Sequence, residues 1–437
     1  MAPANTTALL TDHYELTMVQ AALRSGAAKR RAVFEVFARH LPHGRRYGVV
    51  GGTGRLLDAL ENFCFDGETL EFLRTERIVD GPTASYLESY RFTGDICGYG
   101  EGDCYFPGSP ILVVEAPFAE AVVLETITLS VLNHDSAIGS AASRMVTAAG
   151  DRPIIEMGSR RTHEQAAVAS ARAAYLAGFA STSNLQARKS FGIPTAGTSA
   201  HAFTLVHDSE RHAFAAQLEA LGTGTTLLVD TFDVARAVRT AVELAGPGLG
   251  AVRIDSGDLA AVAREVRELL DSLGATATRI VVTGDLDEYG IAALAAAPVD
   301  SYGVGTALVT GSGSPTASLV YKLVARADSD RGGAPLRPMA KRSVGKPGRG
   351  GRKWAVRHRD DRGSALAEVI TLAPPEPGPH DRSLLRPLVR GGEIIGREAI
   401  EDVRKRHTRA LAELPPQARQ LSRGDPAIPT LFLPDGD

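Results

Sequence analysis

Residues 251–274, AVRIDSGDLAAVAREVRELLDSLG, form one complete strand, loop and helix pattern. The β-branched run 251–254 leads to Asp255 and then to the polar turn 256–258. Apolar residues next recur at helical spacing until Gly274, at Leu259, Val262, Val266, Leu269 and Leu270. The segment therefore predicts a strand whose carboxyl end carries Asp255, followed at once by an amphipathic helix.

Similar units surround this one between about Ile154 and Val324. Short extended runs are expected at 154–155, 194–197, 226–230, 279–283 and 299–302, and helices at about 163–178 and 233–244. Alternation at roughly 20–30-residue spacing predicts parallel strands joined by crossover helices. The predicted fold class is α/β, a closed or distorted barrel, with an open doubly wound sheet as the alternative.

The segments on either side of this core are patterned differently. The N-terminal flank carries a helical pattern at 14–23, a strand pattern at 32–37 and a β-rich stretch with glycine turns around 94–102. The C-terminal flank carries a Gly- and Lys/Arg-rich stretch at 343–353, a Pro-rich connector at 374–379 and a helix at about 397–414. We expect domains at 1–130, 131–324 and 325–437, with the two flanks meeting in one discontinuous α+β domain.

Composition limits the class of protein. With 437 residues, two or three domains are expected, and 44% apolar with 23% charged residues is ordinary globular composition. Lys+Arg 48 against Asp+Glu 51 gives a net charge of −3, so charge alone implies no polyelectrolyte partner. Disordered, collagen-like and histone-like proteins are excluded.

Cysteine usage and hydropathy favour a soluble cytoplasmic protein. The three cysteines, Cys64, Cys97 and Cys104, lack the paired spacing of a zinc site, and an odd number fits a reducing compartment. The most apolar region, 110–132, contains three glutamates, and the N-terminus has no signal-peptide pattern. We therefore expect neither export nor a membrane span.

Polar residues gather where the predicted strands end, which is the edge where α/β folds place their sites. They are Arg160, Arg161, Ser183, His201, Asp230, Arg253, Asp255, Asp258, Thr283, Gly303, Gly305 and Thr306. The stretch 303–306, GVGT, offers unobstructed backbone N–H groups for a phosphate, although a tight strand-to-helix turn would need the same glycines.

Charged residues at two strand ends suggest an anionic ligand. Arg253 and Asp255 share one face of a strand, and Asp258 follows. A cation with two carboxylates suits an anion, Mg²⁺ and ribose hydroxyls; the alternative is a buried ion pair with Asp258 as a helix cap. The pair 160–161 indicates an anion independently. His201 has small and hydroxyl neighbours that leave room for a ligand, whereas most single histidines are structural or solvated.

Five strings in one order carry a resemblance: LTDHYELTM at 10–18, GSRR at 158–161, GTSAH at 197–201, RIDSGDL at 253–259 and YGVGT at 302–306. Together they closely resemble the nicotinate phosphoribosyltransferase family. The resemblance implies transfer of phosphoribose from phosphoribosyl pyrophosphate to nicotinate, coupled to ATP and Mg²⁺, in NAD salvage. It also implies a type II phosphoribosyltransferase fold, an irregular seven-stranded α/β barrel beside a domain built from both termini, and a homodimer with shared active sites.

The resemblance also implies roles for individual residues. His201 corresponds to the histidine that ATP phosphorylates, with Asp230 and Asp255 near it and near Mg²⁺. Nicotinate contacts are expected from Thr198, Arg253, Ser183 and Tyr14, the last stacking on the pyridine ring from a partner subunit. Phosphoribosyl pyrophosphate contacts are expected from Arg160, Ser256, Gly257, Gly303, Gly305 and Thr306. We hypothesise that Asp255 fixes the His201 tautomer.

Two positions depart from patterns in related enzymes. Met157 stands where many relatives have Phe, so a thioether replaces one aromatic face. Ser183 stands where nicotinamide-using relatives place an aspartate that would repel a carboxylate, which favours the acid as substrate.

Alternatives remain open at this point. Nicotinamide and quinolinate phosphoribosyltransferases are the nearest enzymatic ones. A nucleic-acid-binding protein is suggested by nine Lys/Arg without acids in 337–359, but this run holds only one aromatic residue, Trp354. A phosphate-ligand sensor on an inactive barrel is the third.

Overall fold

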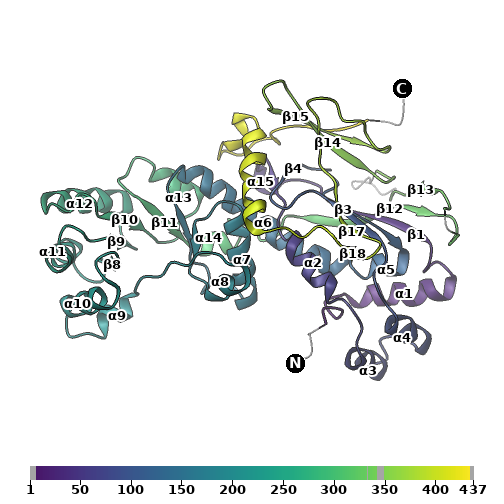
Figure 1. Ribbon diagram of the computed structural model, residues 1–437, viewed down its shortest axis with the longest axis horizontal. Coiled ribbons are helices and arrows are strands. Elements are labelled where there is room, and N and C mark those ends of the chain that lie inside the picture. Colours follow the sequence, from purple (N-terminus) through teal and green to yellow (C-terminus); the bar gives the residue numbers. More distant parts are fainter. Residues whose placement is uncertain (1–5, 332, 342–348, 434–437) are drawn as a thin grey trace. The chain divides into compact units, whose positions relative to one another are not determined.

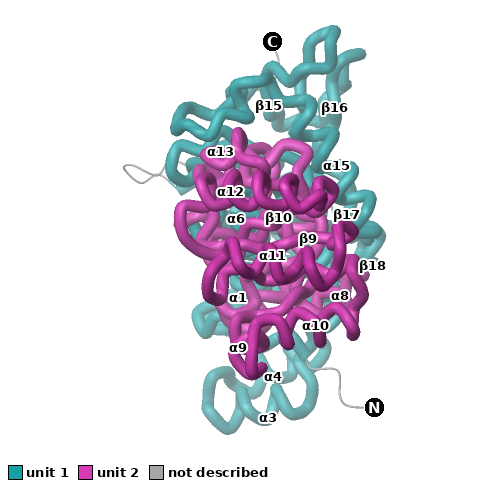
Figure 2. Tube along the Cα trace, turned by 90° about the vertical axis from the view of Figure 1, so that its left-hand side faces the viewer, with its two compact units in different colours: residues 1–140, 314–437 teal, residues 141–313 magenta. Residues whose placement is uncertain are grey.

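The structure is a computed structural model that describes residues 6–331, 333–341 and 349–433. It divides into two compact units (Figure 2): unit 1 comprises Met1–Ser140 and Ser314–Asp437, and unit 2 comprises Ala141–Gly313. Both ends of the chain thus contribute to unit 1. Of the basic stretch 337–359, residues 342–348 lie outside the described residues.

Unit 2 is built on a six-stranded parallel sheet with the order β7-β6-β11-β10-β9-β8. The strands are β6 (Ile154–Glu156), β7 (Ser181–Thr182), β8 (Thr226–Leu228), β9 (Ala251–Ile254), β10 (Arg279–Val282) and β11 (Ser301–Val304). The α/β fold class predicted from the repeating units is confirmed, as a half-barrel of parallel strands.

The segment expected to form a strand at 194–197 contributes a single bridge. Thr195 pairs in parallel with Thr182 beyond β7, and the flanking bonds run from Thr182 N to Pro194 O and from Ala196 N to Thr182 O. Pro194 has no N–H to donate, which shortens any ladder here. The seventh strand position of the sheet is therefore occupied by one bridged residue.

Helices connect these strands and cover the sheet. Figure 1 shows α10, α11 and α12 along the same side of β8, β9 and β10. The helices of unit 2 are α7 (Glu164–Leu176), α8 (Leu185–Phe191), α9 (His201–Leu205), α10 (Glu210–Leu221), α11 (Val234–Ala245), α12 (Leu259–Ser272), α13 (Glu288–Ala293) and α14 (Thr306–Val309).

Helix α12, which follows β9, begins directly after a side-chain N-cap. Asp258 is the N-cap of α12 and accepts a hydrogen bond from the N–H of Ala261 at 3.1 Å. Ala263, Val266 and Leu270 of this helix are buried. Side-chain capping removes an unsatisfied N–H and stabilises a helix by about 1 kcal/mol. Asp258 thus has the capping role that was the alternative to a ligand role.

Unit 1 contains a seven-stranded antiparallel sheet that combines the two ends of the chain. Its order is β13-β12-β1-β5-β3-β17-β18. The strands are β1 (Arg31–Ala38), β3 (Asp95–Gly98), β5 (Leu112–Pro117), β12 (Leu319–Ala327), β13 (Leu336–Pro338), β17 (Arg386–Arg390) and β18 (Glu393–Ile394). The early strand β1 lies between β5 and β12, and Phe34 of β1 stacks on Tyr321 of β12 with ring centroids 4.8 Å apart.

Smaller elements complete unit 1. A four-stranded sheet contains β14 (Trp354–Arg359), β15 (Ala365–Thr371), β16 (Arg382–Ser383) and β19 (Thr430–Phe432), and β2 (Gly48–Val49) pairs with β4 (Cys104–Tyr105). The helices are α1 (His13–Ser25), α2 (Thr53–Glu61), α3 (Gly67–Thr75), α4 (Gly81–Glu88), α5 (Phe118–Val122) and α15 (Ile400–Glu413), while α6 (Glu125–Ala149) runs on into unit 2. Within the described part of the chain, no helix combines the length and apolarity that crossing a membrane requires.

Candidate active site

The strongest cluster of predicted site residues lies in unit 2, where β8 and β9 end. Asp230 follows β8, and Asp255 follows β9, which itself carries Arg253. His201 is the first residue of α9, and Thr198 precedes it in the loop. Carboxyl ends of parallel strands share one edge of a sheet, so residues distant in sequence meet here.

The His201 imidazole lies between a hydroxyl and two carboxylates. Its Nδ1 is 3.1 Å from Thr231 Oγ1, within hydrogen-bond distance. Its Nε2 is 3.9 Å from Asp230 Oδ1 and 3.8 Å from Asp255 Oδ2. The ring is 41% exposed. An imidazole held at one nitrogen and open to ligand suits proton or phosphoryl transfer.

Asp230 is the buried member of this cluster, with a side chain only 3% exposed. Its Oδ2 accepts hydrogen bonds from the N–H of Asp255 and from the Ser256 hydroxyl, both at 2.8 Å. Its Oδ1 is buried and has no hydrogen-bond partner within the described residues. A buried acceptor is costly without a donor, so this oxygen is poised for His201 Nε2–H or a ligand.

Asp255 is more accessible, with a side chain 36% exposed. Its Oδ1 accepts a hydrogen bond from the Thr283 hydroxyl at 2.6 Å, which leaves Oδ2 directed toward His201. The following loop is fitted closely to this residue: a Cβ at Gly284, where φ is +114°, would lie 2.6 Å from the Asp255 carbonyl oxygen.

Arg253 forms the cationic side of the cluster. Its guanidinium donates a hydrogen bond to the Thr198 hydroxyl, and its Nε is buried without a partner within the described residues. Burial lowers the pKa of Arg253, Asp255 and Asp230 oppose that shift, and the nearby Arg160 adds to it. Two guanidiniums close enough to repel one another favour an anionic ligand between them.

The glycines after β11 are explained in part by packing. A Cβ at Gly303 would lie 2.5 Å from Thr283 Cγ2 and 2.7 Å from Met157 Sδ, and one at Gly305 would lie 3.1 Å from the Met157 carbonyl oxygen. Gly303 therefore gives Met157 its place beside the sheet. Thr306 is exposed and begins α14.

Other predicted residues lie outside this network of contacts. Ser183 is exposed just after β7, and Gly257 is exposed with φ +88°. Tyr14 belongs to unit 1, where it is the second residue of α1 and 46% exposed. Burial and the neighbouring Glu125 raise the pKa of Tyr14 to about 12, so its hydroxyl stays protonated.

Two structurally important residues were missed by the sequence analysis. Thr231 contacts the imidazole directly, and its position next to Asp230 at a predicted strand end was the available signal. Glu156 ends β6 fully buried, where it accepts hydrogen bonds from the Thr182 hydroxyl and the N–H of Gly158. Burial raises the pKa of Glu156. An acid within an apolar strand was its signal.

The cluster offers two carboxylates as potential metal ligands, those of Asp230 and Asp255. No group of three or more His, Cys, Asp or Glu side chains arranged to hold a metal ion occurs within the described ranges. Any further ligands of a metal ion at this cluster would have to come from a substrate or from water.

Comparisons with known proteins identify relatives over nearly the whole chain. The model of the nicotinate phosphoribosyltransferase N-terminal domain matches residues 9–133. Nicotinate phosphoribosyltransferase pncB1 of Mycobacterium tuberculosis is 56% identical over 98% of this chain and 95% of its own length, and pncB2 is 40% identical over 95% and 89%. The crystal structure of human nicotinic acid phosphoribosyltransferase matches with a TM-score of 0.83 and 26% identity, covering 97% of each chain.

Proposed function

The chain belongs to the nicotinate phosphoribosyltransferase family, and on this premise we propose that it makes nicotinate mononucleotide for NAD salvage. The pyridine nitrogen of nicotinate forms a bond to C1 of phosphoribosyl pyrophosphate. The bond from C1 to the pyrophosphate oxygen breaks, and pyrophosphate leaves with the electron pair.

The observation that carries this proposal is the grouping of Arg253, Thr198 and the His201 cluster at one sheet edge. The reaction passes through a state with positive charge on the sugar and negative charge on the leaving phosphates. The guanidinium of Arg160, which is near enough to Arg253 to affect its pKa, would stabilise the departing anion, and the carboxylates would stabilise the sugar cation. Both kinds of group lie within this cluster.

We further propose that ATP drives the reaction through His201. A ring nitrogen of the neutral imidazole attacks the γ-phosphorus of ATP, a P–N bond forms, and ADP leaves. Hydrolysis of that bond later releases phosphate. Asp230 and Asp255 face Nε2, where they favour a proton on that nitrogen. The phosphoryl acceptor is then Nδ1, beside Thr231.

Mg²⁺ is proposed to bind at Asp230 or Asp255 together with the substrate phosphates. Oδ1 of Asp230, which has no hydrogen-bond partner among the described residues, and Oδ2 of Asp255 both face His201, so one of them would accept from Nε2–H and the other would be left for Mg²⁺, which prefers one or two carboxylates plus phosphate oxygens. When bound, the ion neutralises charge on the pyrophosphate.

Substrate choice is proposed to depend on charge. Arg253 offers a cation for the nicotinate carboxylate, and Ser183 is a neutral residue at a position where nicotinamide-using relatives are expected to have an aspartate. The homodimer, and stacking of a partner's Tyr14 on the pyridine ring, remain proposals that follow from the family.

The test is product formation by the purified protein with phosphoribosyl pyrophosphate, Mg²⁺ and each of nicotinate, nicotinamide and quinolinate, with and without ATP. We expect nicotinate mononucleotide and pyrophosphate in equal amounts, stimulated by ATP, and acid-labile label on His201 from γ-labelled ATP. His201→Ala should abolish label. Turnover of quinolinate without ATP would overturn the choice of substrate. If the Asp255→Asn variant formed phosphohistidine at the wild-type rate, Asp255 would not be the residue that fixes the His201 tautomer.

A further inference from the structure

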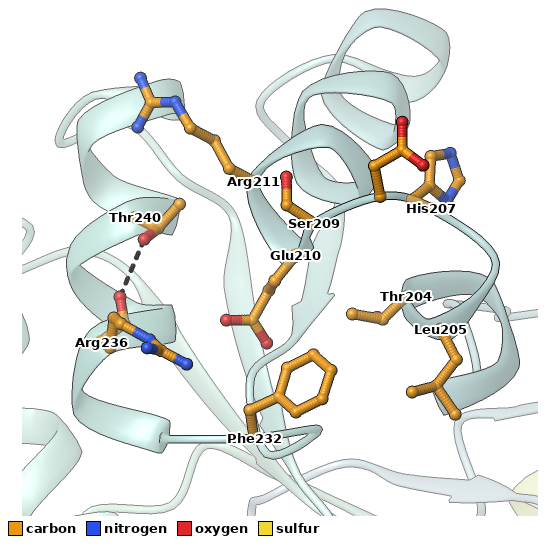
Figure 3. A pocket seen from close by; sticks show the side chains of 10 residues that line it. Thr204, Leu205, His207, Ser209, Glu210, Arg211, Phe232, Arg236 and Thr240 are labelled. Carbon is orange, nitrogen blue, oxygen red and sulfur yellow. Dashed lines mark hydrogen bonds between the residues drawn. The ribbon is translucent and has the colours of Figure 1, made fainter.

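A cavity of about 430 Å³ lies beside the His201 cluster and is unused by the reaction proposed above. All of its lining residues belong to unit 2, and one side of it is open to solvent. Thr204 and Leu205 of α9 form one side, Arg236 and Thr240 of α11 the other, and Phe232 lies between them. Figure 3 shows the Glu210 carboxylate, from the first turn of α10, pointing toward Phe232.

Glu210 is the unusual residue of this cavity. It is 9% exposed, and its Oε1 is buried without a hydrogen-bond partner in the part of the chain that the structure describes. Burial raises the pKa of Glu210, and the positive charge of Arg236 opposes that effect. A buried carboxylate oxygen lacking a donor is costly, so a ligand that brings an N–H group would remove the cost.

Apolar side chains in the lining suit a ligand with a flat ring. Phe232 is 57% exposed and Leu205 is 62% exposed, so an apolar ring face and an aliphatic side chain are both open to this cavity. Arg236 adds a hydrogen-bond donor near the Glu210 acceptor. An acceptor beside a donor complements the edge of adenine, whose amino group donates while ring N1 accepts.

Two lining residues of the cavity also lie close in the chain to His201 and its partner Thr231. Helix α9 begins at His201 and ends at Leu205, which at 1.5 Å per residue is a rise of about 6 Å. On the other side, Thr231, which contacts His201, directly precedes Phe232. If an adenine ring packs against Phe232, the ribose and triphosphate of the same ATP molecule are long enough to reach the His201 imidazole.

We propose that this cavity binds the adenine ring of the ATP that phosphorylates His201, with Glu210 accepting from the adenine amino group and Phe232 supporting the ring. The inference rests on the proposed function, because it supplies a nucleotide site for that step. The hypoxanthine base of inosine has a carbonyl in place of the adenine amino group and an N–H in place of N1. Its acceptor would therefore face the Glu210 carboxylate and its donor would face the Arg236 guanidinium, and both contacts are unfavourable.

The test measures His201 labelling as a function of ATP and of inosine triphosphate. In the wild type, KM for ATP should be at least about tenfold below that for inosine triphosphate. Glu210→Gln and Phe232→Ala should each raise KM for ATP about tenfold, and Glu210→Gln should remove the preference between the nucleotides. ATP-independent turnover of nicotinate should be unchanged in both variants. Matched controls on α10 are Glu219→Gln and Leu221→Ala, which are exposed and lie outside the cavity.

Calorimetric binding of a nonhydrolysable ATP analogue separates this inference from the proposed function. If the wild type binds the analogue and Glu210→Gln weakens binding, the cavity assignment holds even where His201 takes no label. An unchanged affinity in both variants, equal use of the two nucleotides, or no binding by the wild type would overturn it.

Discussion

Nδ1 of His201 lies 3.1 Å from the hydroxyl of Thr231, while both neighbouring carboxylates face the opposite ring nitrogen. The imidazole is thus oriented by a neutral group on one side and by negative charge on the other. This arrangement favours a proton on Nε2, with the electron pair of Nδ1 directed at the Thr231 hydroxyl.

Thr231 is expected to position His201. Thr231→Val removes the hydroxyl and keeps the shape, so the rate of His201 labelling by ATP should fall about fivefold, the effect of one neutral hydrogen bond. Thr231→Ser should restore it, and KM for nicotinate should not change. Rapid-quench labelling across pH 6–9 measures the effect. Equal rates in all three proteins would contradict the positioning role.

Arg253 is expected to control nicotinate binding. Arg253→Lys loses the planar fork that reaches Thr198, so KM for nicotinate should rise about tenfold or more. Steady-state kinetics with nicotinate as the varied substrate test this, and the exposed Arg264→Lys on α12 is the control. An unchanged KM would place the carboxylate of nicotinate elsewhere.

Gly303 is expected to tolerate no side chain. Gly303→Ala brings a methyl group to 2.5 Å from Thr283 Cγ2, and overpacking of this kind costs about 1–3 kcal/mol of unfolding free energy. Thr283→Ser removes the opposing methyl group and keeps the hydroxyl that contacts Asp255. The double variant should therefore recover part of the loss in urea unfolding. A single variant as stable as the wild type would show that the space is larger than the structure indicates.

Glu15 should make stability depend on pH. Burial raises its pKa from 4.5 to about 7, although hydrogen bonds from Thr11 and Thr126 oppose the shift. Between these values the folded chain holds a proton that the unfolded chain has lost, so the free energy of unfolding falls as pH rises. The loss for this group is at most about 3 kcal/mol.

Glu15→Gln lacks this titration, and its stability relative to the wild type should increase from pH 5 to pH 8. Urea unfolding of both proteins at several pH values measures the difference. Parallel stability curves would mean that Glu15 ionises normally.

The sequence predicted the elements whose patterns are local. The unit from Ala251 to Gly274 was recognised because its strand, cap and apolar spacing lie within one short segment. Helices expected at 163–178 and 233–244 are observed as Glu164–Leu176 and Val234–Ala245. The grouping of Asp230, Asp255 and His201 was expected because strand ends converge in α/β folds.

Features that depend on packing between distant segments were not predictable in this way. Nothing near Gly303 in the sequence indicates that Met157 and Thr283 occupy the space beside it. Oε1 of Glu210 is buried without a hydrogen-bond partner among the described residues, and a sequence pattern does not specify such burial for one acid at a helix start. Asp258 is an example of a role that local sequence does predict. Of the two alternatives given for it, ligand binding and helix capping, the structure shows the capping contact to Ala261.

The position of β1 between β5 and β12 has a consequence for synthesis of the chain. A ribosome releases β1 and β5 early, but β12 emerges only after every residue of unit 2 has been translated. Until β12 has been synthesised, one edge of β1 has no strand to pair with. A nascent chain halted before Leu319 thus exposes a strand edge open to pairing with other polypeptides, a hazard that the finished protein lacks at this strand.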